Sequence, residues 1–223
     1  DNISNALIKM IAIKTIYYGL LGICLVTLLF HSKRLNRIYF WFIPIIIFAI
    51  TVQASQDILK QQNISGYDFV FHIYQPVEYS LLALFYYQLI NNGMVKKLIL
   101  FSIPVVLLFS VVYYSVGNGV FYGGDFIDFC VCAFFINVWV VIFFFELLRS
   151  DENMHLVHYP AFWVNAGNLL FYGGCLMVMG VYFSVLGTDP GTANQLLKVN
   201  HYLNLVLYSL YIIGFTQPLR WKK

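Results

Sequence analysis

Charged side chains are scarce in this sequence of 223 residues. Asp, Glu, Lys and Arg together make up 10% of the chain, whereas 61% of it is hydrophobic. A typical soluble domain carries about 25% charged residues. A soluble domain of this length could not bury so much apolar surface. The composition therefore excludes an ordinary water-soluble fold and predicts a chain whose solvent is lipid.

Motifs of common soluble enzymes are also missing. The sequence contains no P-loop, no G-x-G-x-x-G and no H-E-x-x-H, the signatures of nucleotide-binding loops and zinc proteases. The formal net charge is only +3, and the basic residues form no run of the kind that binds nucleic acid. We therefore expect no nucleic-acid partner.

Cysteine is rare as well. The four cysteines, Cys24, Cys130, Cys132 and Cys175, all lie inside apolar segments, where cysteine usually packs as a small hydrophobic residue. Cys130 and Cys132 are two residues apart, so on a helix their side chains point in different directions. The sequence predicts neither a disulfide framework nor a metal site.

Long apolar runs, by contrast, are abundant. A membrane-spanning helix needs about 20 mostly apolar residues, and short polar linkers separate seven such segments. They cover residues 6–30, 38–58, 68–91, 95–116, 126–148, 160–187 and 193–216. No internal repeat or second domain is evident. We expect an all-α integral membrane protein in which seven transmembrane helices form one bundle, a single domain over residues 1–223.

The placement of lysine and arginine predicts the orientation in the membrane. If the N-terminus is outside, nine basic residues fall on the inner side: Lys33, Arg34, Arg37, Lys96, Lys97, Arg149, Arg220, Lys222 and Lys223. Four then fall on the outer side: Lys9, Lys14, Lys60 and Lys198. Because basic residues favour the cytoplasmic side, we expect an outer N-terminus and a cytoplasmic C-terminus. The expected location is the inner, or plasma, membrane of a bacterium.

This topology resembles that of rhodopsins, G-protein-coupled receptors and bacterial heptahelical proteins. The resemblance lies in topology, since the receptor motifs Asp-Arg-Tyr and Asn-Pro-x-x-Tyr are absent. Lys198 lies only about one turn into the last segment, too near its end for a retinal-binding lysine. Seven-helix metal-dependent lipid hydrolases would need a second histidine near His201, and Leu205 stands there. The resemblance implies a receptor-like membrane protein without retinal.

Polar residues recur at helical spacing inside four of the segments, as expected where they face protein or water. When the segments are placed by depth, one group falls around an outward-facing cavity: Lys14, Gln53, Gln56, Asp57, His72, Gln75, Glu78, Tyr79, His201 and Asn204. A second group forms an inner polar layer: Asn165, Asn168, Tyr172, Tyr208 and Tyr211. The fourth segment is nearly free of polar residues and is expected to face lipid. Asp125 and Asp128 are expected to form a solvated rim.

Glu78 is the most unusual of these residues. A carboxylate near the middle of a membrane costs roughly 3 kcal/mol, so it must be protonated, paired or hydrated. Its partner could be Lys14, His201 or a tyrosine, or it could bind a ligand or proton. His72 and His201 could form interhelical hydrogen bonds or sense pH. A bis-histidine haem would use both, although no other haem signal accompanies them.

Three functions are compatible with this pattern. The first is a heptahelical sensor that binds a small, unidentified ligand or a proton and acts through a membrane or cytoplasmic signalling partner. The second is a lipid-modifying enzyme with Glu78 or His72 as general base. The third is an accessory or structural subunit of a larger membrane complex, in which the polar residues serve packing alone. Membrane lipid is a partner in all three.

Overall fold

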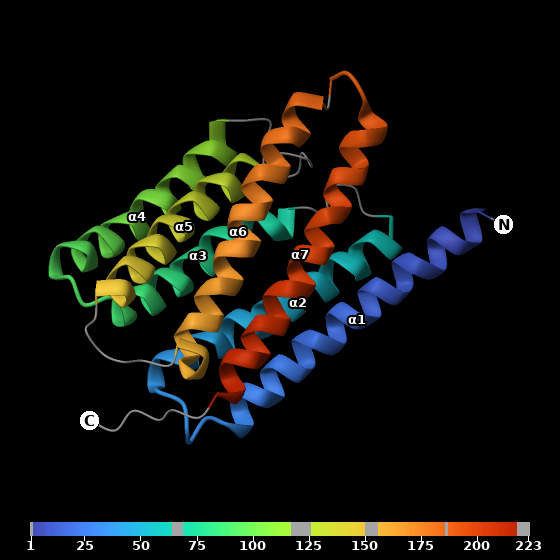
Figure 1. Ribbon diagram of the computed structural model, residues 1–223. Helices are drawn as coiled ribbons and strands as arrows, with labels where there is room; N and C mark the ends of the chain where they lie inside the picture. Colours follow the sequence, from blue (N-terminus) through green and yellow to red (C-terminus); the bar gives the residue numbers. More distant parts are fainter. Residues whose placement is uncertain (1, 64–68, 117–125, 150–155, 186, 218–223) are drawn as a thin grey trace. The chain divides into compact units, whose positions relative to one another are not determined.

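The computed structural model describes residues 2–63, 69–116, 126–149, 156–185 and 187–217. Over these ranges the chain is helical and contains no strand (Figure 1), which confirms the all-α prediction. The elements are α1 (Asn2–Phe30), η1 (Arg37–Trp41), α2 (Phe42–Gln61), α3 (Phe69–Leu89), α4 (Gly93–Val116), α5 (Ile127–Arg149), η2 (Leu156–His158), α6 (Pro160–Val185) and α7 (Pro190–Thr216). Each predicted segment coincides with one of the seven long helices.

Five helical segments are long and apolar enough to cross a membrane. They are Ala12–Phe30, Arg37–Gln61, Gly93–Ser115, Ile127–Arg149 and Pro160–Val185. The chain is therefore a multi-pass membrane protein. Within the described residues, α3 and α7 are not among these spans, and both carry several polar side chains. The seven-span topology and the orientation of the termini stay predictions.

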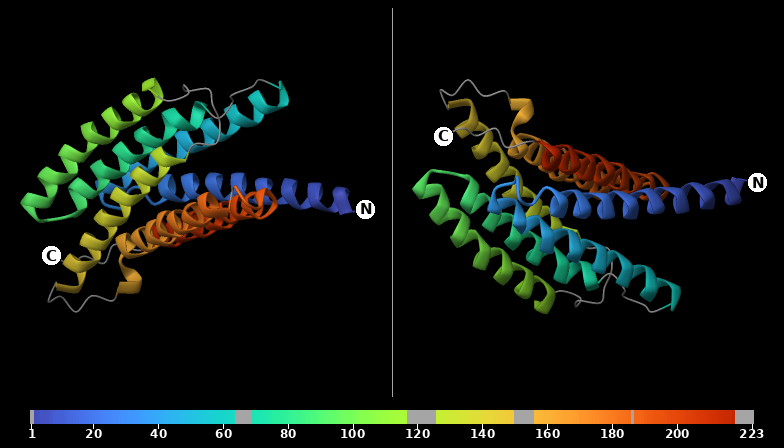
Figure 2. Two further views of the ribbon diagram at one scale, coloured as in Figure 1. Left: turned by 90° about the horizontal axis from the view of Figure 1, so that it is seen from above. Right: turned by 90° about the horizontal axis from the view of Figure 1, so that it is seen from below.

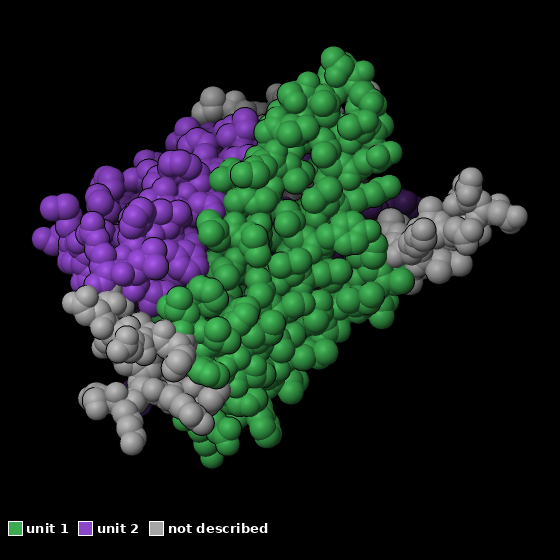
Figure 3. Space-filling view, viewed as in Figure 1, with its two compact units in different colours: residues 1–36, 154–223 green, residues 37–153 purple. Residues whose placement is uncertain are grey.

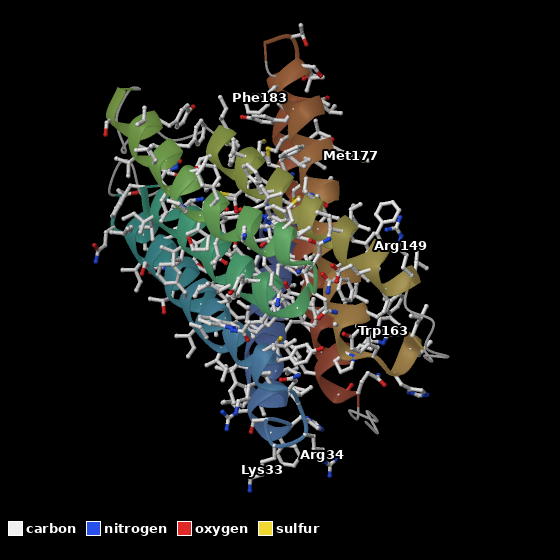
Figure 4. The ribbon with its side chains drawn as sticks, turned by 90° about the vertical axis from the view of Figure 1, so that its left-hand side faces the viewer. Lys33, Arg34, Arg149, Trp163, Met177 and Phe183 are labelled. Atoms are coloured by element: carbon white, nitrogen blue, oxygen red, sulfur yellow. The ribbon has the colours of Figure 1, made fainter. Side chains whose placement is uncertain are left out.

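Large apolar side chains cover the outer surfaces of these spans. Phe101 and Leu108 of α4 are exposed, as are Met177 and Phe183 of α6, which are labelled in Figure 4. Such an apolar exterior would be a liability in water but suits contact with lipid chains. The exposed surface thus agrees with the membrane assignment.

Contacts divide the chain into two compact units, coloured in Figure 3. Unit 1 comprises residues 1–36 and 154–223 and contains α1, α6 and α7. Unit 2 comprises residues 37–153 and contains α2 to α5. The arrangement of all seven helices in one bundle stays a prediction.

In unit 1, α6 and α7 run side by side (Figures 1 and 2). Glycines on α6 make this approach possible. A Cβ atom added at Gly167 would lie 3.4 Å from Leu207, and one added at Gly174 would lie 3.0 Å from Leu203. Small residues at such contacts allow helix backbones to pack closely in membranes. α1 packs against α7, where the rings of Tyr17 and Tyr208 are 5.7 Å apart.

The first turn of α7 is capped by Asp189. Its Oδ1 accepts hydrogen bonds from the backbone N–H groups of Gly191 (3.0 Å) and Thr192 (3.1 Å), and its Oδ2 accepts one from the Thr192 hydroxyl (2.5 Å). A side-chain acceptor at this position satisfies helix N–H groups that have no partner within the helix. The hydrogen bonds from Thr192 hold the pKa of the Asp189 carboxyl below its ordinary value.

We expect acid to loosen the start of α7 through Asp189. Because its pKa is lower in the folded chain, the capping contribution is fully present above the ordinary aspartate pKa of about 3.9 and is lost as pH falls through the lowered value. Amide hydrogen exchange at Gly191 and Thr192 should therefore increase in acid beyond its intrinsic pH dependence. Asp189→Asn is the matched control, since asparagine caps equally well but does not titrate. Equal acid sensitivity in both proteins would contradict the prediction.

In unit 2, α3 is the central helix and packs against α2, α4, α5 and η1. Its buried side chains include Leu82, Ala83 and Phe85, and the Phe85 ring packs edge-on against Phe42 of α2 at 4.9 Å. Because α3 has protein on several sides, its polar residues can meet partners on other helices. This central position explains why a polar helix is accommodated in an apolar chain.

Candidate functional site

Asp128 lies in the first turn of α5 and is only 1% exposed. Its Oδ1 accepts a hydrogen bond from the Ser110 hydroxyl (2.6 Å), and its Oδ2 accepts one from the Tyr114 hydroxyl (3.2 Å). The His72 ring of α3 lies 4.3 Å from the Tyr114 ring and within electrostatic range of the carboxyl group. We call these four residues the Asp128 cluster. It joins α3, α4 and α5 in the interior of unit 2.

The Asp128 cluster corrects one prediction. Asp128 is buried and does not form a solvated rim, while Asp125 lies outside the described residues. α4 exposes apolar side chains, as expected of a helix that faces lipid, but it also buries Ser102 and Ser110. Each serine hydroxyl also lies within hydrogen-bonding distance of a carbonyl of its own helix, so the sequence gives no sign that it needs a partner on another helix. The spacing of Ser102, Ser110 and Tyr114, which are eight and four residues apart, could have indicated a polar face on this helix.

Glu78 has a tyrosine partner on its own helix. The Tyr74 hydroxyl, one turn earlier on α3, donates to Glu78 Oε1 at 2.5 Å, and both residues are buried. The sequence predicts a partner on another helix, such as Lys14, His201 or a tyrosine, whereas this tyrosine lies on the same helix; an interhelical partner of Glu78 stays a prediction. Cys132 of α5 is buried within electrostatic range of both Glu78 and Asp128. Glu78 of α3 therefore lies near the part of α5 that carries Asp128 and Cys132.

A second set of hydrogen bonds, the Tyr79 network, also links these three helices. The Trp139 Nε1–H group of α5 donates to the Tyr79 hydroxyl of α3 at 3.4 Å. The Tyr79 oxygen lies 2.5 Å from Ser102 Oγ of α4, and the Ser102 hydroxyl donates to the Ile99 carbonyl at 2.6 Å. Since the Ser102 proton is used there, Tyr79 donates to Ser102. The network ties α3, α4 and α5 together.

The remaining predicted cavity residues of unit 2 lie on α2 and α3. Gln56 is only 7% exposed, and its Nε2 makes no hydrogen bond to a described residue. Gln53, Asp57 and Gln75 are half-buried. These residues are thus buried or half-buried, and the cavity that they would line stays a prediction.

In unit 1, the residues of the predicted inner polar layer are all buried: Asn165, Asn168, Tyr172, Tyr208 and Tyr211. The Tyr211 hydroxyl of α7 donates to Asn168 Oδ1 of α6. Asn165 donates through Nδ2 to the Ala161 carbonyl at 2.8 Å, whereas no described residue donates to its Oδ1. Asparagine and tyrosine side chains therefore connect α6 and α7, the role that interhelical polar residues most often have in membranes.

The other predicted cavity residues of unit 1 come from α1 and α7. Lys14 is half-buried and lies within electrostatic range of His201, which is exposed. Asn204 is half-buried and donates through Nδ2 to the Asn200 carbonyl at 3.0 Å. A cavity that would combine these residues with those of unit 2 stays a prediction.

Comparisons with known proteins do not add a family to these observations. The sequence matches no protein-family model, and no curated protein or solved structure is significantly similar to the chain. In the part of the chain that the structure describes, no three His, Cys, Asp or Glu residues are grouped so that they could hold a metal ion. The function is therefore inferred from the geometry of the side chains.

Proposed function

We propose that this chain is a multi-pass membrane sensor whose input is a proton taken up by the Asp128 cluster. The observation that carries the proposal is a buried carboxyl group that accepts hydrogen bonds from two hydroxyl groups and lies within electrostatic range of a histidine, whose ring packs against one of the two donors. Histidine is the side chain whose ordinary pKa lies nearest neutrality. An acid and a histidine that share a buried site are coupled, since the charge of one changes the free energy of charging the other.

Burial favours a proton over a larger ligand at this site. Asp128, Ser110 and His72 are all buried, and both oxygens of Asp128 already accept hydrogen bonds. A molecule with several heavy atoms would have to displace these side chains, whereas a proton needs no additional space. A change of charge in such a low-dielectric setting has a large energetic effect.

The cluster also lies where a local change can reach three helices. His72 belongs to α3, Ser110 and Tyr114 to α4, and Asp128 to α5. Gain or loss of a proton changes the strength of the hydrogen bonds between α4 and α5. The packing of α5 against α3 and α4 then changes, and the proposed readout is the position of the loops at the opposite ends of these helices. A separate signalling protein would detect that change.

In the proposed orientation the N-terminus is outside and the C-terminus is in the cytoplasm of a bacterium. The start of α5 then faces the outer side, so the cluster takes its proton from outside the cell. The inner loops would carry the output. The excess of lysine and arginine on the proposed inner side supports this orientation.

Infrared difference spectroscopy tests the proton site directly. The purified chain in lipid nanodiscs would be compared between mildly acidic and mildly alkaline buffer. A carboxyl group that gains a proton produces a C=O stretching band that a carboxylate lacks. We expect such a difference band in the wild type and its loss in Asp128→Asn, which keeps the shape of the side chain but cannot titrate.

Asp57→Asn is the matched control, because it makes the same chemical change at a half-buried acid of α2 in the same unit. It should leave the Asp128 band in place. A wild-type difference spectrum that Asp128→Asn does not alter would overturn the proposal. In that event Asp128 would be a packing residue, as expected for an accessory or structural subunit.

A further inference from the structure

The opposite end of α5 carries a second arrangement, built around Glu146. Its two carboxylate oxygens accept hydrogen bonds from the backbone N–H groups of Asn91 (2.9 Å) and Asn92 (3.1 Å), which connect α3 to α4. The Asn92 side chain in turn caps α4, since its Oδ1 accepts from the N–H groups of Met94 (2.9 Å) and Val95 (3.3 Å). The end of α5 and the start of α4 are thereby held together.

Basic residues lie close in the sequence to Glu146 and to the turn that it holds. Lys97 and Arg149 are exposed, and Arg149, the last residue of α5, is labelled in Figure 4. Lys96 is half-buried, with its Nζ 5.5 Å from the centroid of the Tyr87 ring. With Glu146, these side chains sum to a charge of +2, from three positive groups and one negative group. Both oxygens of the single acid already accept backbone hydrogen bonds.

Exposed apolar side chains lie next to these cations in the chain. Met94, two residues before Lys96, is 75% exposed, and Leu148, adjacent to Arg149, is 76% exposed. The span Gly93–Ser115 begins beside Met94, and the span Ile127–Arg149 ends beside Leu148. In a bilayer, residues at the ends of spans lie where the hydrocarbon meets the headgroups. An apolar side chain can then enter the acyl region while its cationic neighbour reaches the phosphate layer.

We propose that this end of unit 2 is a binding surface for the phosphate headgroups of anionic membrane lipids. The Glu146 surface, as we call it, consists of Met94, Lys96, Lys97, Glu146, Leu148 and Arg149. Glu146 acts as a positioning residue, because it fixes the turn that presents the two lysines beside Arg149. The charge of the surface favours anionic lipids, and its exposed apolar residues favour a bilayer over a soluble anion.

The test uses the full chain in neutral detergent, titrated with short-chain phosphatidylglycerol or phosphatidylcholine. Native mass spectrometry would count the lipid molecules retained, and thermal denaturation would report the stabilisation. We expect the wild type to prefer phosphatidylglycerol. The double variant Lys97→Gln/Arg149→Gln should bind it about twenty-five-fold more weakly, or about five-fold for each charge removed. Its affinity for phosphatidylcholine should not change.

Two further variants separate this surface from general electrostatics and from misfolding. Lys60→Gln/Lys198→Gln removes two exposed charges elsewhere and should keep the preference for phosphatidylglycerol. Lys97→Arg/Arg149→Lys preserves the charge and should bind like the wild type. The proposal would be overturned if the Lys60→Gln/Lys198→Gln control lost as much phosphatidylglycerol binding as Lys97→Gln/Arg149→Gln. It would also be overturned if the wild type bound the two lipids equally well. Equal stabilisation by inorganic phosphate would overturn the assignment to lipid.

Glu146→Gln provides the sharpest test, because net charge and geometry predict opposite results. The substitution makes the surface more positive, so attraction through net charge alone would strengthen binding of phosphatidylglycerol. The glutamine side chain has only one acceptor oxygen and cannot hold both Asn91 and Asn92. We expect binding to weaken several-fold as the turn is released, and a gain in affinity would contradict the positioning role of Glu146.

Discussion

Replacing Asp128 with alanine is expected to lower the free energy of unfolding by about 2 to 3 kcal/mol. The substitution removes the acceptor of two hydrogen bonds and leaves the Tyr114 hydroxyl without its partner on α5, in addition to the small cavity that is created. The single hydroxyl proton of Ser110 can turn to the Val106 carbonyl, 3.0 Å away, so its share of the loss should be the smaller one. Denaturant titration in mixed micelles would measure the change.

The variants Ser110→Ala and Asp128→Asn give the smaller losses of stability expected for this cluster. Ser110→Ala removes one donor and should cost about 1 kcal/mol. Asp128→Asn retains an acceptor oxygen and should cost less than Asp128→Ala. If Asp128→Ala were as stable as the wild type, the carboxyl group would not hold α4 and α5 together, and the structural basis of the proposed sensor would be lost.

Replacing Gly214 with valine is expected to destabilise unit 1 by about 3 kcal/mol. A Cβ atom at this position would lie 3.0 Å from the carbonyl oxygen of Pro160 and 3.3 Å from side-chain atoms of Trp163 and Val164. The nearest of these is a backbone atom, which cannot move aside as the end of a flexible side chain can. The clash can therefore be relieved only if α6 and α7 separate, and overpacking of this kind costs about 1–3 kcal/mol or more of stability.

Gly180→Val is the matched control, because a Cβ atom there would meet nothing within 4 Å. The same side chain is added to a helix of the same unit, so intrinsic helix propensity contributes equally to both variants. We expect Gly180→Val to unfold at nearly the wild-type denaturant concentration. If the free energy of unfolding fell by similar amounts in the two variants, close packing of α6 on α7 would not limit the size of residue 214.

Helical periodicity was sufficient for contacts that lie within one helix. Tyr74 and Glu78 are four residues apart, and a helix places such residues on adjacent turns of one face, where the structure shows them hydrogen-bonded. The stripe on α6 is a similar case, since Asn165, Asn168 and Tyr172 are all buried. In both cases the relevant geometry is the 3.6-residue repeat, which the sequence already contains.

The Asp128 cluster could not be found in the same way. Asp128 follows a polar linker that contains another aspartate, and such a position is usually solvated. Its burial depends on how the end of α4 packs against the start of α5, where Ser110 and Tyr114 lie eighteen and fourteen residues earlier in the chain. Both buried serines of α4, Ser102 and Ser110, also have acceptors within their own helix, so their sequence context does not reveal a partner on another helix.

The sequence by itself determined that this chain is helical and belongs in a membrane, because helix length and hydropathy are properties of continuous segments. It also determined which residues share a helix face. Only the tertiary structure decided which polar groups meet: Asp128 with two hydroxyls of α4, Tyr79 between Ser102 and Trp139, and Glu146 with the turn before α4. Each of these contacts joins a helix to another helix or to a turn elsewhere in the chain, and a hydrogen bond forms only when packing brings its donor and acceptor within hydrogen-bonding distance.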